Sequence, residues 1–579
     1  MKNVKNLFGM AVMATALVGC SSNDNLNPNA NDNAGKAGTA YASFKINLPT
    51  VSGTRAPGDP DGTPDFKPGD AAEYEVKNGT ILIFDKKTDL FVTRVELGTM
   101  NPWKEDTDNK GITTAASVTV QLSGVELNGN YKALVLLNNN SETTPKVKLP
   151  TTSDTYTSWS AKAANANANE YVKTDGIFMA NAPEYIDAST EPTTLVDIKK
   201  VYASREEAQA NASTVVYVER GLAKVTMDKF DDKYTIGTGN TYEGDEVVIK
   251  KWQLDVTNKS TFPVHQIGTL STGYTGIWGK DRFYDGTNTA FKRVYWGIDP
   301  NYSDNKYYNG DATISPKKSA LECCQEDFKM ITNAQVVGEV GTPQYCLENT
   351  FNLDNMKQGQ TTRVVFKAVY TPKTFTSGET FYKVANNTAV WHGDDLKQQI
   401  LTLALQAMNV TDPIEKAKYD VDLSKGSDIS GVAGQHLIQK ANITYSGTPA
   451  ASKVDDNVVN EVNAKLGLSE ADPTNHKEKV GISTYLNGEA YYIARIKHFN
   501  QLTPWTAGEA YGTKNDKYLG RYGVLRNNWY SLSVKSISNL GYPEVPEVKP
   551  EKPDDENDKY INVEVKILDW ALRKQVIEL

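Results

Sequence analysis

The chain has 579 residues, of which 39% are hydrophobic and 23% charged, and it contains only four cysteines. This composition is too apolar for a disordered protein and too poor in cysteine for a disulfide scaffold. The formal net charge is −9 and no run of five or six like charges occurs, which argues against a nucleic-acid partner.

The first twenty residues predict export. Lys2 and Lys5 form a basic start, and the apolar stretch Leu7–Gly19 that follows is too short to span a bilayer as a helix. The stretch ends in the sequence LVGC, which resembles a lipobox. The resemblance implies that residues 1–19 are a signal peptide and that Cys20 becomes the acylated N-terminus of an outer-membrane lipoprotein precursor. The alternative is an ordinary signal peptide with a coincidental cysteine.

Residues 20–55 are expected to form a lipidated propeptide with one removable strand. An asparagine-rich segment, residues 21–33, predicts a flexible tether because it has almost nothing to bury. In Tyr41–Leu48 apolar and polar residues alternate, which predicts a half-buried strand. Its apolar residues are Ala42, Phe44, Ile46 and Leu48. The loop that follows is rich in Gly and Pro and exposes Arg55, as expected of a protease cleavage site.

The long middle of the chain has the pattern of antiparallel β-sandwiches. Short β-branched and aromatic runs recur between Gly, Asn and Asp turns from about Glu73, and a second series begins at Val215. We therefore expect a mainly β protein with two β-sandwich domains, residues 56–212 and 213–542. Two helices are predicted to interrupt the second domain, at Asp394–Met408 and Val458–Leu466.

Residues 543–579 are expected to form a spacer and a final strand. Pro543–Pro553 is rich in Pro and Glu and precedes an acidic run, which predicts a stiff, solvated spacer that holds the next segment away from the body. Tyr560–Ile567 then alternates apolar and polar residues. The apolar residues of this strand and its continuation are Ile561, Val563, Val565, Ile567, Leu568 and Trp570. A strand this apolar has to be buried.

The two terminal strands match, since each offers four apolar residues at alternate positions. Cleavage after Arg55 would release the first strand and open a groove that the final strand of another molecule could fill by β-augmentation. Four buried aliphatic side chains contribute about 6 to 12 kcal/mol before ordering costs. Such a contact joins two different surfaces and extends into a filament. The alternative is that Tyr560–Ile567 folds back as the last strand of its own sandwich and that Arg55 is an ordinary loop residue.

Several segments resemble one family. The best matches are Val524–Gly541, before the spacer, and Val563–Trp570; Tyr217–Val225 and Tyr131–Asn138 match more weakly. With the order of lipobox, strand, basic site, two β domains, spacer and final strand, the chain resembles the fimbrillins of type V pili, closest to Mfa-type stalk subunits.

The resemblance implies transthyretin-like sandwiches and a structural subunit of a cell-surface fimbrium that supports adhesion and biofilm formation. It also implies cleavage between Arg55 and Ala56, and polymerisation by donor-strand exchange through Tyr560–Trp570. Partners would be other copies of the chain and accessory fimbrial subunits. The short spacer and the three body cysteines depart from the stalk pattern. An accessory, anchor or tip role therefore stays open.

The sequence gives little support for catalysis, a cofactor or a metal. The five histidines are scattered, and the grouping of His392 with Asp394 and Asp395 lies at a predicted helix N-terminus, where acidic residues are favoured anyway. Asp59 and Asp61 lack the remaining ligands of a calcium loop. The rival hypothesis is a surface-anchored lipoprotein that binds glycans on exposed aromatic rows among its nine Trp and 30 Tyr.

The body cysteines Cys323, Cys324 and Cys346 are an odd set for an exported protein. One bridge to Cys346 is possible, and it would leave one thiol over.

Overall fold

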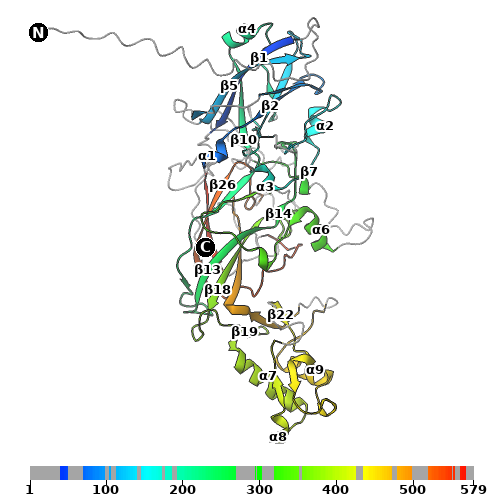
Figure 1. Cartoon of the computed structure of the whole chain (residues 1–579), viewed down its shortest axis with the longest axis vertical. Coiled ribbons are helices and arrows are strands. Elements are labelled where there is room, and N and C mark those ends of the chain that lie inside the picture. Colours follow the sequence, from blue (N-terminus) through cyan, green and yellow to red (C-terminus); the bar gives the residue numbers. More distant parts are fainter. Residues whose placement is uncertain are drawn as a thin grey trace, which may run out of the picture.

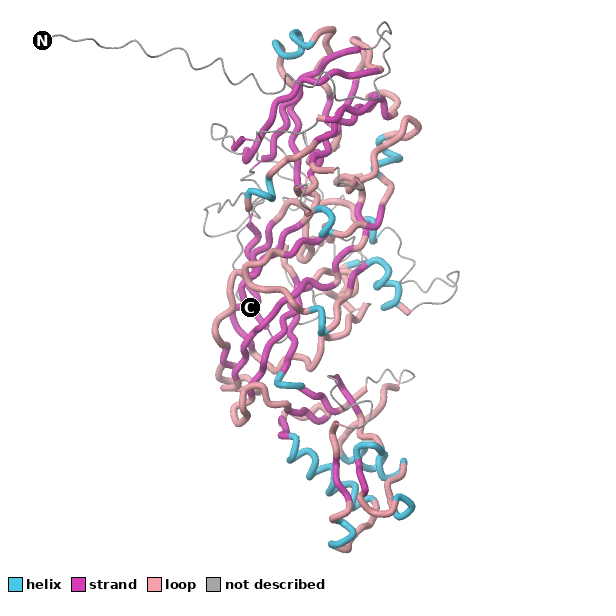
Figure 2. Tube along the Cα trace, in the orientation of Figure 1, coloured by secondary structure: helices cyan, strands magenta, loops and turns pink. Residues whose placement is uncertain are grey.

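The computed structural model shows a mainly β chain built from three stacked parts (Figures 1 and 2). It describes residues 39–49, 69–97, 104–105, 112–139, 145–172, 176–184, 192–268, 294, 296–302, 319–350, 355–424, 434–472, 479–498, 519–550, 552–554 and 561–568. The part that contains β1 (Thr39–Pro49) and the part that contains α7 (Gly393–Ala407) lie at opposite ends of the elongated molecule. The expectation of a mainly β fold is confirmed.

The first part is one curled sheet. In spatial order its strands are β3 (Phe91–Glu96), β2 (Gly79–Asp85), β6 (Tyr131–Leu137), β8 (Met179–Asn181), β10 (Thr214–Arg220), β1, β5 (Ile112–Ser123) and β4 (Lys104–Glu105), with β9 (Val196–Asp197) beside β6. Strand β2 shows why it folds this way: Ile81 and Ile83 face the core shared with β1, whereas Leu82 and Phe84 face a second core on the other side. Apolar residues on both faces of a strand require cover on both faces.

The second part is a sandwich of two four-stranded sheets. One sheet has the order β17 (Gln344–Cys346), β11 (Ala223–Met227), β26 (Trp529–Ile537) and β27 (Ile561–Leu568). The other has the order β12 (Tyr234–Thr235), β13 (Glu246–Asp255), β18 (Arg363–Thr371) and β25 (Glu489–Arg495). Alternate side chains from both sheets meet in one core, in which Trp252, Phe366 and Tyr492 are fully buried. This is the packing that the alternating sequence pattern predicts.

The third part is inserted between β18 and β25, which pair with each other. It contains a sheet of β20 (Val390–His392), β19 (Phe381–Val384), β24 (Ile482–Tyr485) and β22 (Gly434–His436), the pair β21 (Tyr419–Val421) and β23 (Ile443–Tyr445), and the helices α7, α8 (Pro413–Lys416) and α9 (Asp456–Lys465). Both predicted helices are present as α7 and α9. Leu396 and Ile400 of α7 pack in the same core as Val462 of α9. The helical spacing of apolar residues therefore predicted correctly which face of each helix is buried.

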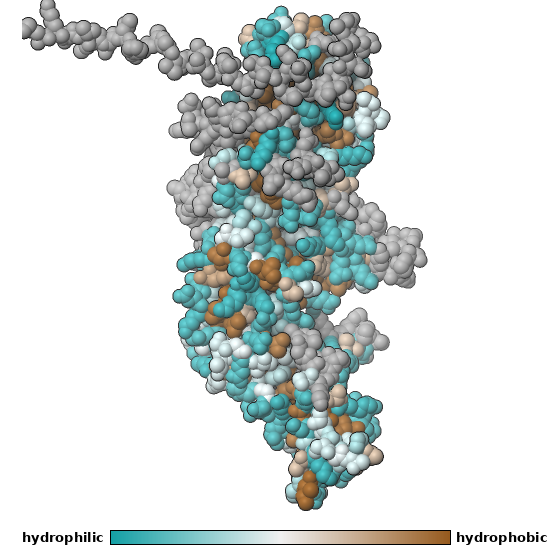
Figure 3. Space-filling view, viewed as in Figure 1, coloured by the Kyte–Doolittle hydropathy of each residue, from teal (hydrophilic) through white to brown (hydrophobic). Residues whose placement is uncertain are grey.

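Shorter elements lie around and between these parts. They are the pairs β7 (Ala164–Asn165) with β15 (Ser260–Thr261) and β14 (Thr257–Asn258) with β16 (Phe328–Lys329), and the helices α1 (Ala71–Tyr74), α2 (Tyr156–Ser160), α3 (Ala168–Tyr171), α4 (Arg205–Ala210) and α6 (Ala320–Asp327). On the face drawn in Figure 3, hydrophobic residues lie in small groups among hydrophilic ones.

The boundary expected at residue 212 falls too early. Strand β10 pairs with β1 and β8 and belongs to the first sheet, and the chain changes sheets at Gly221, between β10 and β11. A Cβ atom on Gly221 would lie 2.8 Å from the ring of Phe178, so the close crossing needs glycine. Residues on both sides of the crossing are buried, so 214–227 forms a largely apolar run in the sequence.

The predicted solvated spacer is corrected by the structure. Residues 542–550 and 552–554, which we call the proline-rich strap, lie against the second part of the chain. Tyr542 exchanges backbone hydrogen bonds of 2.7 and 2.8 Å with Tyr491, and the carbonyl of Pro546 accepts a 2.7 Å bond from Arg363. Val548 and Asp554 are 5% exposed. The strap is docked because its valines and carbonyls find partners on β18 and β25.

Candidate strand-exchange groove

Strand β1 lies between two other strands. It runs parallel to β10, with Phe44 opposite Thr214 and Asn47 opposite Tyr217. It runs antiparallel to β5 along nearly its whole length, from Thr39 to Pro49. Both backbone edges of β1 are therefore hydrogen-bonded, and the strand occupies a groove within the sheet.

One face of β1 contributes directly to the core of the first part. The four apolar residues singled out in the sequence, Ala42, Phe44, Ile46 and Leu48, are at most 1% exposed, and Ala40 is also buried. They pack with Val216 and Val218 of β10 and with Val120 and Leu122 of β5. Removing β1 would therefore expose a wide apolar surface.

The polar face of β1 is covered as well, contrary to the half-buried strand that the alternation predicts. Segment 202–210, which includes α4 and which we call the α4 cover, lies over this face. Ser43 Oγ donates a 2.7 Å hydrogen bond to the carbonyl of Ala208 and lies 2.8 Å from Thr119 Oγ1. Arg205 Nη2 donates a 3.0 Å bond to the Thr119 carbonyl, and Tyr202 exchanges two 2.8 Å backbone bonds with Tyr41. Ser43 is consequently only 8% exposed.

The C-terminal strand has a different setting. Strand β27 lies at the edge of its sheet and runs antiparallel to β26, from Ile561 opposite Ile537 to Leu568 opposite Trp529. This is the fold-back that the sequence left open as an alternative. In the part of the chain that the structure describes, β27 has one strand partner, whereas β1 has two.

Cys20, Arg55, Ala56 and Trp570 lie outside the described residues. The described chain resumes at residue 69, and Glu73 of α1 is the first firmly held side chain after the Arg55 loop.

Glu73 ties this segment to the second part of the molecule. Its carboxylate lies 2.6 Å from Lys224 Nζ and accepts a 2.5 Å hydrogen bond from the Tyr345 hydroxyl. Its carbonyl accepts a 2.8 Å bond from Arg220 Nε. Burial lowers the pKa of Arg220 to about 10, and the neighbouring charge of Glu73 opposes that shift. Sequence reasoning missed this network, although charged residues inside the apolar run 214–227 were a signal for buried ion pairs.

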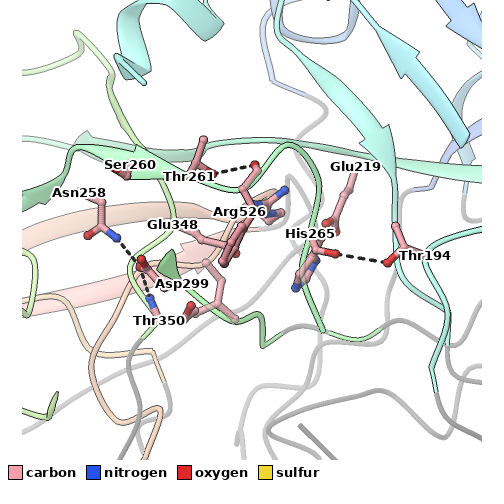
Figure 4. Close-up of polar contacts among 12 residues, drawn as sticks. Thr194, Glu219, Asn258, Ser260, Thr261, His265, Asp299, Glu348, Thr350 and Arg526 are labelled. Atoms are coloured by element: carbon pink, nitrogen blue, oxygen red, sulfur yellow. Dashed lines mark hydrogen bonds and ion pairs between the residues drawn. The ribbon is translucent and has the colours of Figure 1, made fainter. Parts of the chain in front are cut away.

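Figure 4 shows a second buried polar group. His265 Nδ1 lies 2.6 Å from Glu219 Oε1, and Arg526 Nη2 donates a 2.5 Å hydrogen bond to Glu348. Burial raises the pKa of Asp299, whose carboxylate accepts bonds from neighbouring asparagines. Beside Arg526, the side-chain oxygen of Asn527 accepts hydrogen bonds from the backbone amide and the guanidinium of Arg220 in β10, so polar contacts join the two parts here.

The described residues contain no group of three or more His, Cys, Asp or Glu arranged to hold a metal ion. His392 lies 2.7 Å from Glu379 and stacks on Phe375, at the N-cap of α7. No described helix is both long and apolar enough to cross a membrane.

A segment near the C-terminus matches a known family. Residues 483–576, which run from within β24 to beyond β27 and include the strap, match the family model described as "Major fimbrial subunit protein type IV, Fimbrillin, C-terminal". The predicted resemblance to fimbrillins is confirmed. No curated protein sequence matches the chain.

Several solved structures align with most of the chain. A putative cell adhesion protein from Parabacteroides distasonis ATCC 8503 aligns over 93% of this chain and 99% of its own, with 10% identity and a TM-score of 0.38. One from Bacteroides eggerthii DSM 20697 aligns over 92% and 97%, with 11% identity and a TM-score of 0.34. The tip fimbrial protein Mfa3 from Porphyromonas gingivalis, with C-terminal truncation, aligns over 92% and 100%, with 11% identity and a TM-score of 0.29.

Proposed function

We propose that this fimbrillin is a structural subunit of a cell-surface fimbrium, exported as an outer-membrane lipoprotein acylated at Cys20. A protease cuts between Arg55 and Ala56, β1 leaves its groove, and the final strand of another copy replaces it. The filaments built in this way support adhesion and biofilm formation. The observation that carries the proposal is the position of β1, which precedes Arg55 in the chain and lies between two strands with its apolar face in the core.

The two strand positions differ in a way that favours exchange. An emptied groove would leave the edges of β5 and β10 unpaired, and unpaired edges and apolar surface attract a new strand. Strand β27 has a single partner, β26, at the edge of its sheet. A terminal strand that moves from this edge into the groove gains a second hydrogen-bonded neighbour. Four buried aliphatic side chains add about 6 to 12 kcal/mol before the ordering cost.

The cleavage step is tested with Arg55→Ala. We expect the variant to accumulate as a lipid-anchored precursor that begins at Cys20, whereas the native chain begins at Ala56. Arg94→Ala is the matched control, because Arg94 is an exposed arginine of β3. Intact mass and N-terminal sequencing of the surface protein give the readout, together with a gel of unboiled samples. A native chain that still begins at Cys20 and runs as a monomer would favour the anchored or glycan-binding alternatives.

The donor role is tested by deleting residues 560–579. We expect an exported, folded monomer that does not polymerise. Val565→Asp should have the same effect within the full chain, while Glu564→Ala, at the alternate position of the strand, should not. Normal filaments from the deletion variant would refute the assignment of this strand as the donor.

A further inference from the structure

The two terminal strands correspond position by position in sequence. When Ala42 is matched with Ile561, the apolar residues Phe44, Ile46 and Leu48 fall on Val563, Val565 and Ile567. Tyr41 then falls on Tyr560, and Ser43 on Asn562. A polar residue of such a strand could be replaced freely if it faced solvent. Ser43, however, is buried under the α4 cover.

The enclosure imposes a chemical requirement on the occupant of the groove. The carbonyl of Ala208 is buried and accepts its hydrogen bond from Ser43 Oγ at 2.7 Å. Thr119 Oγ1 lies 2.8 Å from the same hydroxyl. A strand that offers no donor at this position leaves a buried carbonyl unsatisfied, which costs about 1 to 3 kcal/mol.

We propose that the α4 cover selects the register of the donor strand. The side-chain amide of Asn562 from a second copy takes the place of Ser43 and donates a hydrogen bond to the Ala208 carbonyl. This contact fixes the register of strand exchange. The inference rests on the proposed function and specifies its partner contact. The amide carries two donors and one acceptor, so it satisfies both the Ala208 carbonyl and Thr119 Oγ1.

The neighbouring registers fail this requirement. A shift of two residues in one direction places Glu564 opposite Ala208, and an ionised carboxylate is acceptor-only. A shift of two in the other direction places the large Tyr560 ring in a space that holds a serine 8% exposed. A shift of one residue turns the apolar side chains away from the core. The Asn562 register satisfies the core and the cover together.

Cysteine pairs test the register directly. The precursor with Ser43→Cys and Thr119→Cys should form an intramolecular disulfide, because the two residues lie opposite each other on β1 and β5 and their side-chain oxygens are 2.8 Å apart. This precursor is the positive control for the geometry. The full chain with Asn562→Cys and Thr119→Cys should then form intermolecular disulfides in filaments, visible as boiled, non-reduced multimers. Glu564→Cys with Thr119→Cys should remain monomeric on the same gel.

Variants without engineered cysteines test the chemistry. Asn562→Ser should polymerise within about twofold of the native chain, because serine is the group that β1 presents. Asn562→Asp and Asn562→Leu should lower the polymer fraction about tenfold or more, as expected for an unsatisfied buried carbonyl. Glu564→Gln is the matched control and should polymerise normally, because Glu564 falls at the position of Lys45, which is only partly buried.

The outcomes separate the two proposals. A native chain that forms no filaments would refute the proposed function. Filaments that form but cross-link through Glu564→Cys, or that tolerate Asn562→Asp, would leave strand exchange intact and overturn the register.

Discussion

Lys224 Nζ lies 2.6 Å from Glu73 Oε1 and 3.9 Å from the centroid of the Trp529 ring, with 2% of the lysine side chain exposed. The contact joins α1, which follows the Arg55 loop, to β11 and to β26, the partner of β27. The start of the proposed mature chain and the sheet that holds its final strand therefore share one buried ion pair.

Lys224→Met should be strongly destabilising. It leaves the Glu73 carboxylate buried without its cation, and breaking one partner of a buried pair costs about 3 to 5 kcal/mol. Urea unfolding followed by tryptophan fluorescence measures the free energy of unfolding. The control is Lys86→Met, whose partner Asp197 is 56% exposed, and it should change this free energy by less than about 1 kcal/mol. An equal loss of unfolding free energy in the two variants would contradict a stabilising role for the Lys224–Glu73 pair.

The strap is expected to loosen when a single side-chain anchor is removed. Asn333 Oδ1 accepts a 2.7 Å hydrogen bond from the backbone amide of Val545. Asn333→Ala should speed cleavage after Glu547 by a glutamate-specific protease about fivefold to tenfold, because losing the bond raises the population of the open strap. Cleavage is followed by mass spectrometry of native protein. Gln335→Ala removes a bond in the same turn without touching the strap, so an equal acceleration there would argue against the anchor.

Sequence patterns predicted the elements that bury one continuous face. The apolar residues alternate in Tyr41–Leu48 and have helical spacing in 394–408. Both patterns involve residues close in sequence, and the structure buries the apolar face that each pattern predicts. The cover over Ser43 was not predictable in this way, because Ala208 lies 165 residues further along the chain. Tertiary contacts of this range leave no local pattern.

The docking of the strap did leave a local signal. A polyproline-like segment has three residues per turn, so Val545 and Val548 fall on one side of it. Val545 packs against the cluster around Val365 and Tyr491, and Val548 is buried. Proline content alone predicted a solvated spacer; the spacing of the two valines argues for a docked one.

Cys346 is expected to be unreactive towards alkylating reagents in the folded protein. Cys346 carries a free thiol on β17, so the bridge that the cysteine count allowed is not formed. Burial raises the pKa of Cys346 to about 12, and only the thiolate reacts with alkylating reagents. We expect no iodoacetamide adduct at Cys346 in native protein at mildly alkaline pH, and full modification in denaturing urea without a reductant. Modification that requires a reductant would instead reveal a disulfide.

Glu184 should make stability depend on pH. Its backbone pairs with Thr193, and burial raises the pKa of its carboxyl from 4.5 to about 7. Below about pH 4.5 the group is neutral in both the folded and the unfolded chain. As pH rises to 7 the unfolded chain ionises first, so the folded state loses stability, and above 7 it carries the full cost of a buried charge.

Glu184→Gln should therefore be more stable than the native chain at pH 8, by on the order of 1 to 3 kcal/mol, and nearly equal to it at pH 4.5. Urea unfolding at the two pH values measures the difference. Glu126→Gln, at an exposed position, should show no pH-dependent advantage. A benefit of Glu184→Gln that is the same at both pH values would mean that the amide improves packing or hydrogen bonding, and that the ionisation of Glu184 does not limit stability.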